Sequence, residues 1–132
     1  MKKRRKGLRI LAVVAGVLVV FLAGLFVYLM IGQDEVKQTA IENVDVHSIT
    51  DGTYEGSFSA YLWSDTVKVT VKNGKITAIE TVGDPAFLDP ATADELIARV
   101  KDRQTPQVDT VSGATVSSKA FLKAVENALK GA

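Results

Sequence analysis

The residues best suited to do chemistry lie near the C-terminus, in a hydroxyl-rich run at residues 109–118. Within it, Ser112-Gly113-Ala114-Thr115 passes directly into an amphipathic helical pattern. The start of a helix presents unpaired N–H groups and a positive partial charge, so it can seat a phosphate. Thr115 would hold its hydroxyl at that seat, and Gly113 and Ala114 would let a large phosphorylated ligand approach the backbone. A plainer interpretation is that Ser112 or Thr115 merely caps the helix.

Taken together, Asp109, Ser112-Gly113-Ala114-Thr115 and Ser117 resemble the flavinylation motif of the FMN-binding domain family. This family includes the flavoprotein subunits of sodium-pumping quinone reductases and of related ferredoxin-oxidising complexes. In the family, the threonine in the place of Thr115 carries FMN through a phosphoester bond. The resemblance therefore implies FMN as the cofactor.

Two further segments extend the resemblance over roughly residues 51–130. Asp51-Gly52-Thr53-Tyr54-Glu55-Gly56 resembles the opening strand of the family, and Asn73-Gly74-Lys75-Ile76 resembles its hairpin. Two segments depart from the family pattern. After Gly56 the family often continues with further glycines around an aromatic residue, which this chain lacks at Ser57 to Trp63. The usual loop of the family is replaced here by Gly83 to Pro90. Both departures concern the pocket of the flavin ring and leave the attachment motif intact.

The resemblance implies a role for each residue of the motif. The resemblance implies that a separate, exported, Mg²⁺-dependent flavin transferase modifies Thr115, with FAD as donor. The chain itself shows no carboxylate cluster with the character of a Mg²⁺ site and no base paired with Thr115 in sequence. Asp109 would cap the turn through backbone N–H groups or be recognised by the transferase. Ser112, Gly113 and the N–H groups of Ala114 to Ser117 would hold the phosphate. The expected attachment site comprises Asp109, Ser112, Gly113, Ala114, Thr115, Val116 and Ser117.

The flavin ring needs an apolar slot with polar contacts at its edge. The candidates are aromatic or large apolar side chains, namely Tyr54, Tyr61, Trp63, Phe87 and Leu88. For each aromatic side chain, packing in the core or at an edge is the alternative.

A long apolar run follows a basic N-terminus. Ile10 to Ile31 holds 22 residues that are apolar or glycine, apart from Tyr28 near the end. A helix of this length spans about 33 Å, enough to cross a hydrocarbon core of about 30 Å. A cleaved signal peptide is the alternative, but its apolar region is usually shorter and ends in a small-x-small site. We therefore expect an uncleaved membrane anchor.

Charge differs on the two sides of the apolar run. The first nine residues hold six basic side chains and no acidic one, whereas the remainder holds ten basic and fifteen acidic side chains. The positive-inside rule places the N-terminus in the cytoplasm and the rest of the chain outside it. The basic stub also suits contact with anionic lipid. Because the exported part is acidic and its lysines are scattered, we expect no binding of nucleic acid.

The side-chain inventory excludes other chemistry. The chain has no cysteine, which excludes disulfides, thiolate metal ligands and a lipoprotein anchor. His47 is the sole histidine and has no metal partner of its own kind, so we expect it to be a surface or packing residue. We therefore expect no metal site and no catalytic residue.

Four segments organise the chain. We expect a cytoplasmic basic stub at residues 1–9, a transmembrane anchor at 10–31, a polar linker at 32–50 and an FMN-binding domain at 51–132. The linker would prolong the membrane helix and then join the domain as an extended arm. About 80 residues of domain support one small core.

Alternating residues predict a small antiparallel sheet. Apolar and polar residues alternate with a period of two, the pattern of half-buried strands, at Thr66 to Lys72 and at Lys75 to Val82. A further strand is expected before them, at Thr53 to Phe58. Asn73-Gly74 is the preferred two-residue hairpin turn, because both positions need positive φ.

Two helices should follow, after chain breaks at Asp84-Pro85 and Asp89-Pro90. Residues 91–102 would form the first, with Leu96, Ile97 and Val100 on its apolar stripe, and 116–130 the second. The predicted class is α+β: a small antiparallel sheet with a hairpin packed against two helices, preceded by one N-terminal transmembrane helix.

The leading hypothesis is a membrane-anchored, extracytoplasmic flavoprotein that relays electrons between a membrane donor and an external acceptor. The short architecture with a single membrane span suits an electron carrier or a subunit better than an autonomous enzyme. One alternative is an anchored binding or interaction module without flavin. Another is the same domain binding FMN without a covalent link.

Overall fold

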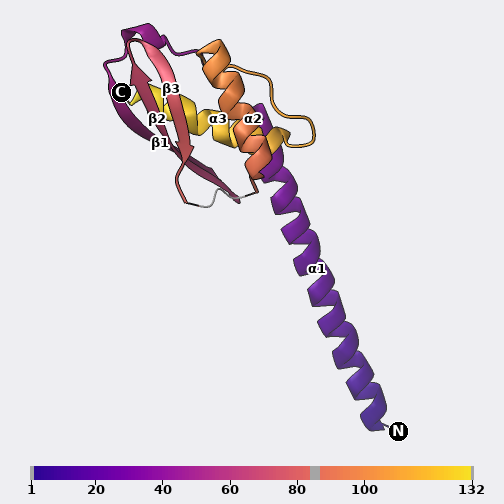
Figure 1. The fold of residues 1–132 in the computed structure, drawn as a ribbon. Coiled ribbons are helices and arrows are strands. Elements are labelled where there is room, and N and C mark those ends of the chain that lie inside the picture. The colour runs from indigo at the N-terminus through magenta and orange to yellow at the C-terminus, as the bar shows by residue number, and fades with distance from the viewer. Residues whose placement is uncertain (1, 84–86, 132) are drawn as a thin grey trace. The chain divides into compact units, whose positions relative to one another are not determined.

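A computed structural model describes residues 2–83 and 87–131. The expected break at Asp84-Pro85 lies outside these residues. The chain forms two compact units, Met1–Ile31 and Gly32–Ala132. Figure 1 shows the helices and the small sheet of the described chain. Three α-helices and an antiparallel three-stranded sheet within that part confirm the predicted α+β class.

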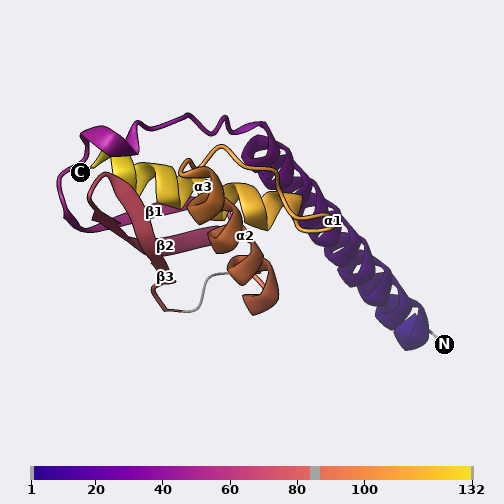
Figure 2. The same ribbon diagram turned by 45° about the horizontal axis from the view of Figure 1, so that its top comes forward.

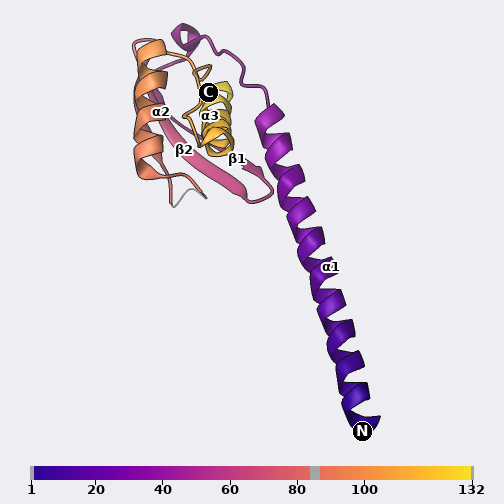
Figure 3. The same cartoon turned by 90° about the vertical axis from the view of Figure 1, so that its right-hand side faces the viewer.

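The N-terminal helix α1 spans Lys2–Gln38 without a break (Figure 3). It is long and apolar enough to cross a membrane, by length and composition. From residue 3 to the end of the apolar run, nearly all its side chains are exposed. The helix continues beyond Ile31 because Gln33 to Gln38, which are polar apart from Val36, contain no strong helix breaker.

The sheet consists of β1 (Gly52–Ala60), β2 (Trp63–Lys72) and β3 (Lys75–Thr81), in the order β1-β2-β3. All neighbours are antiparallel. The predicted hairpin is confirmed: Asn73 and Gly74 join β2 to β3 with φ of 54° and 71°. Alternate residues of β2 are buried, as the period of two requires.

Helix α2 spans Pro90–Arg103 and confirms the helix predicted at 91–102. Asp89 caps its start, because the side chain accepts a bond of 3.3 Å from the N–H of Thr92. Gln104 ends it in the left-handed conformation, with φ of 58°. The side-chain amide of Gln104 then bonds both the N–H and the carbonyl of Ile76, at 2.6 and 3.1 Å, and ties α2 to β3.

Helix α3 spans Thr115–Lys130 and packs along β1 and β2 (Figure 2). The close approach depends on Gly56. A Cβ added there would lie within 2.5 Å of backbone atoms of Ala124 and Ala128, so no other residue fits without moving the helix. Phe121 and Val125 are fully buried in the core between α3 and the sheet.

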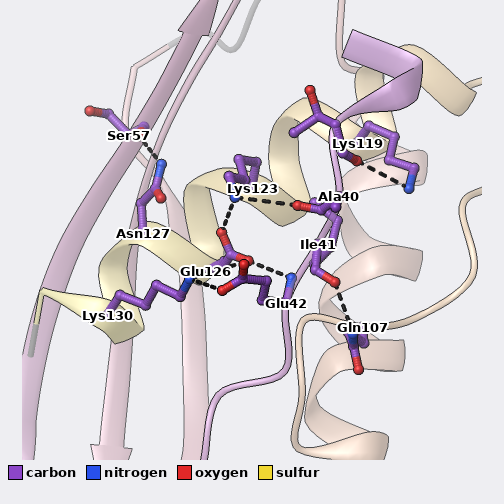
Figure 4. Close-up of polar contacts among 11 residues, drawn as sticks. Ala40, Ile41, Glu42, Ser57, Gln107, Lys119, Lys123, Glu126, Asn127 and Lys130 are labelled. Atoms are coloured by element: carbon purple, nitrogen blue, oxygen red, sulfur yellow. Dashed lines mark hydrogen bonds and ion pairs between the residues drawn. The ribbon is translucent and has the colours of Figure 1, made fainter. Parts of the chain in front are cut away.

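A second segment covers α3 from the opposite side. Residues 39–44, which we call the strap, run beside the helix (Figures 2 and 4). Lys119 and Lys123 of α3 donate to the carbonyls of Thr39 and Ala40, at 3.5 and 3.3 Å. Leu122, on this side of α3, is therefore as fully buried as the apolar face that the sequence predicts.

A buried carboxylate anchors the strap. Glu126 of α3 is fully buried, and its Oε1 accepts a bond of 2.5 Å from the N–H of Glu42. Lys123 forms an ion pair with its other oxygen. The bond with Lys130 holds the pKa of Glu42 below its usual value and raises the pKa of Lys130. These contacts place residues that the sequence suggested as a linker inside the compact unit Gly32–Ala132.

Candidate functional site

A tight turn precedes α3. The N–H of Ala114 donates to the carbonyl of Val111 at 3.0 Å, so Ser112 and Gly113 occupy the two central positions. Gly113 has a φ of +79°, the left-handed value that a type II turn needs at this position. A Cβ added to Gly113 would meet nothing within 4 Å, so the glycine serves the backbone angle and the space beside it is open.

The first turn of α3 has an exposed hydroxyl and unused donors. The residue before the helix is Ala114, and no side chain caps the helix end. The alternative that Ser112 or Thr115 is a cap is therefore wrong, and the Thr115 side chain is exposed. The first helical bond runs from the N–H of Ser118 to the carbonyl of Ala114. In the described chain, the N–H groups of Thr115, Val116 and Ser117 have no partner.

The other hydroxyls of this turn have structural partners. Ser117 is buried and its Oγ donates to the carbonyl of Phe87 at 2.7 Å. Ser118 accepts a bond of 3.2 Å from the N–H of Val111. The N–H of Ala114 closes the turn, so it leaves the expected set of phosphate donors. Within the motif, Thr115 and Ser112 keep their hydroxyls exposed.

Arg99 of α2 holds the chain that leads into the turn. Its Nη1 donates to the carbonyls of Asp109 and Thr110, at 2.8 and 3.2 Å, and its Nη2 pairs with Glu95 at 2.5 Å. Sequence reasoning missed this role, because the residues are ten positions apart and the only signal was a basic residue late in a helix. Arg99 also lines a cleft of about 330 Å³ that includes Asp109 and Arg103.

The Asp109 carboxylate does not cap the turn. The side chain is exposed, and no described residue donates a hydrogen bond to it. Only the backbone carbonyl of Asp109 is bonded, to Arg99. The carboxylate is therefore open to a partner outside the chain.

Two of the aromatic candidates lie together near the start of α3. Trp63 is 6% exposed and packs against Val36 and Ala120. Its ring centroid lies 5.9 Å from that of Phe87, which is 66% exposed. The bond from Ser117 to Phe87 ties this pair to the first turn of α3, and Val116 packs on the same cluster. An exposed aromatic face thus adjoins the turn.

The remaining ring candidates lie elsewhere. Tyr54 packs against the main core, six residues along β1 from Ala60, which pairs with Trp63. This separation corresponds to about 20 Å of strand. The Tyr61 hydroxyl donates to Glu35 at 2.5 Å. Leu88 is buried in the main core.

Asp65 is a buried carboxylate that sequence reasoning did not single out. It is 2% exposed, and neither of its oxygens has a hydrogen-bond partner in the described residues. Burial raises its pKa to about 6. It lies two residues from Trp63 on the same buried face of β2. The predicted strand began at Thr66, one residue too late to reveal this position.

The structure thus provides a hydroxyl acceptor beside an anion seat. Three unpaired N–H groups and the positive end of α3 suit an anionic group such as a phosphate. The described residues contain no group of three His, Asp or Glu side chains that could hold a metal ion. The donors that this turn offers to an anion are backbone N–H groups.

Known proteins match the same part of the chain. A family model described as FMN-binding domain matches residues 63–130. An uncharacterized protein of Treponema pallidum (strain Nichols) is 34% identical over 83 residues, which cover 61% of this chain and 23% of that protein. The chain thus spans about a quarter of the length of this relative. The family match begins at Trp63, so it includes β2, β3, both later helices and the turn before α3.

Proposed function

The chain belongs to the FMN-binding domain family, and we propose that it is a membrane-anchored, extracytoplasmic electron carrier with FMN linked to Thr115. FMN is the cofactor that family membership indicates. The proposal adds the covalent link, the compartment and the relay of electrons. One observation carries it. The Thr115 hydroxyl is exposed and caps no helix end, and it lies beside three backbone N–H groups that have no partner in the described residues.

The geometry of this seat fits a phosphoester. Thr115 is the first residue of α3, so a phosphorus atom bonded to its Oγ would lie close to the N–H groups of the first turn. These donors and the helix dipole stabilise negative charge there. The open space beside Gly113 leaves room for the rest of the nucleotide. Arg99 holds the preceding segment through two carbonyls, which limits the positions the turn can take.

The link would form by transfer from FAD. The Oγ of Thr115 attacks the phosphorus on the riboflavin side of the pyrophosphate. The new Thr–O–P bond forms, the bond to the bridging oxygen breaks, AMP leaves, and the hydroxyl proton passes to solvent or to a base of the transferase. No described side chain is hydrogen-bonded to the Thr115 hydroxyl, and we assign the base and the Mg²⁺ to a separate transferase. The unpaired Asp109 carboxylate is a contact that this transferase could recognise.

The aromatic pair would position the ring system. When bound, FMN supplies reversible one-electron and two-electron redox chemistry. Phe87, backed by the buried Trp63, offers an apolar surface at the end of the sheet where α3 begins. The exposed face of Phe87 suits contact with a flat aromatic ligand. The chain's contribution is to hold the ring and to keep one side of it dry.

The N-terminal helix supports the anchor and its orientation. Its apolar run is long enough to cross a bilayer, and the basic residues precede it. The positive-inside rule then puts the flavin domain outside the cytoplasm. A covalent cofactor cannot diffuse away from an exported protein, which is a clear advantage of the phosphoester there. The electrons would pass between a membrane donor and an extracytoplasmic acceptor.

The test is covalent flavin on the full chain. Full-length protein is co-expressed with an exported flavin transferase, denatured, separated on a gel and inspected for flavin fluorescence. The wild type should fluoresce, and its intact mass should rise by the mass of FMN less one water. Thr115→Ala should lose both signals completely.

A matched control is Thr110→Ala, which removes a hydroxyl five residues earlier and leaves the carbonyl bonded by Arg99. This variant should fluoresce like the wild type. Flavin that is present in the native protein but is lost on denaturation would indicate non-covalent binding and would overturn the link to Thr115. A protein without flavin in either state would instead favour an interaction module.

A further inference from the structure

The turn between β1 and β2 breaks the usual rules for a hairpin. Ala60 pairs with Trp63, so Tyr61 and Leu62 form a two-residue connection. Such turns favour Asn-Gly or Asp-Gly, because their central residues need positive φ. Tyr61 nevertheless has a φ of 56°. Tyr61 and Leu62 are also 41% and 43% exposed. A local rule broken by exposed apolar residues points to a role other than folding.

The same turn lies against the polar end of α1. A Cβ added to Gly32 would lie 2.9 Å from the ring of Tyr61. The Tyr61 hydroxyl donates to Glu35 at 2.5 Å. Gly32 is the next residue after Ile31, where the apolar run ends. Because a helix rises 1.5 Å per residue, Glu35 is only about 6 Å along the helix axis from that end.

From this placement we propose that the Tyr61-Leu62 turn contacts the lipid bilayer at the boundary between head groups and acyl chains. The inference rests on the membrane anchor of the proposed function. When the apolar run fills the hydrocarbon core, the residues that follow lie in the interfacial layer. Tyrosine is enriched in that layer, because its ring is apolar and its hydroxyl can stay hydrated. Leu62 would bury its side chain among the upper acyl carbons.

The contact is apolar rather than electrostatic. Glu35, the charged side chain bonded to the turn, is acidic, so anionic lipid does not attract this surface. We therefore expect the contact in neutral phosphatidylcholine and at high salt, where screened charges would lose their effect.

The contact has a consequence for the flavin. Trp63 follows the turn directly, and its partner Phe87 is bonded to the first turn of α3. The Tyr61-Leu62 turn and the proposed cofactor site therefore lie at the same end of the sheet. The redox partner on this side would then be a component of the membrane, such as a lipid-soluble carrier or an integral protein.

The chain contains no cysteine, so single labels can test the contact. Leu62→Cys and Lys75→Cys are made in the full-length protein and labelled with an environment-sensitive fluorophore. Lys75 is the matched control, since it is also exposed and directly follows the other hairpin turn. Both are reconstituted into phosphatidylcholine vesicles, with and without lipids that carry a bromine quencher on the upper acyl chain.

The label at position 62 should emit at shorter wavelength and be quenched severalfold more than the label at position 75, at low and high salt alike. Equal quenching of the two labels in membrane-integrated protein would overturn the proposal. A label at position 62 that is protected from water in native membranes but not in pure lipid vesicles would also overturn the proposal, because that result indicates a protein partner. Extraction at alkaline pH separates the causes: if the whole protein leaves the vesicles, the anchor itself has failed.

Discussion

The two hairpin turns of the sheet lie at opposite ends of β2 and follow different rules. Asn73-Gly74 has the residues that its backbone angles demand. Tyr61-Leu62 adopts a similar connection with residues that do not suit it. The first turn is explained by folding alone. The second lies beside Trp63 and close to the polar end of α1, where a surface contact explains its side chains better than local stability does.

The same contrast extends to the polar groups near each end. At the Asn73-Gly74 end, the Asp51 carboxylate accepts a bond of 2.7 Å from the N–H of Asn73. At the other end, Asp65 is buried without a partner in the described residues, and Phe87 is exposed. Natural proteins concentrate such departures at functional sites. We therefore associate the Asn73-Gly74 end of the sheet with stability and the other end with the proposed function.

The largest loss of stability should come from a change in β1, at Gly56, where α3 lies against the strand. Gly56→Ala places a Cβ against the backbone of α3, so the helix must shift. We expect a loss of at least about 3 kcal/mol in the free energy of unfolding. Gly52→Ala is the control in the same strand, because its Cβ would meet only ordinary contacts from 3.4 Å outward. Urea denaturation measures both, and equal losses would contradict the close-approach argument.

Asp65 should make the stability depend on pH. Its pKa in the folded state is about 6, against an ordinary value of 3.8. As pH rises through this window the unfolded chain ionises first, so stability falls and the loss is complete above about pH 6. A shift of this size corresponds to about 2–3 kcal/mol. Asp65→Asn should remove this loss.

The measurement is the unfolding free energy of each protein between about pH 4 and pH 7, a window that brackets the raised pKa. Asp102→Asn, which alters an exposed carboxylate, serves as control and should track the wild type. A difference between wild type and Asp65→Asn that stays constant over this range would show that Asp65 has a bonding partner in solution.

Arg99→Met should separate the position of the acceptor turn from its chemistry. The variant keeps the apolar stem but loses the bonds to the carbonyls of Asp109 and Thr110. We expect a stability loss of about 1–2 kcal/mol and slower flavin transfer, seen as a lower maximal rate of labelling. Glu95→Gln removes the ion pair with Nη2 of Arg99 and leaves the bonds from Nη1 to the two carbonyls, so this variant should be labelled at the normal rate.

The smallest effects should distinguish the two turns directly. Gly74→Ala puts a Cβ on a residue with φ of 71° and should cost about 1–2 kcal/mol. Leu62→Ala should change the unfolding free energy by less than about 0.5 kcal/mol, because the side chain is exposed. Only the second variant should weaken lipid contact of the full-length protein. A large stability loss in Leu62→Ala would mean that this turn, too, serves folding.

Local patterns alone predict much of this protein. The sequence predicted the hairpin at Asn73-Gly74, the apolar stripe of Leu96 and Val100, and a last helix at 116–130, which begins one residue earlier in the structure. Each of these depends on periodicity or turn chemistry within a few residues. The class α+β and the FMN family follow from the same short segments. The motif could likewise be located without coordinates, since its residues are contiguous.

Tertiary structure decided how the site is built. The bonds from Arg99 to Asp109 and Thr110, the covering of Glu126 by the strap, and the pairing of Trp63 with Phe87 join residues that are ten or more positions apart. No local period reports such contacts. The free hydroxyl of Thr115 was also undecided in the sequence, because a threonine before a helix serves equally well as a cap or as an acceptor. Only the placement of Ala114 before the helix, with Thr115 as its first residue, settles that the hydroxyl is not a cap.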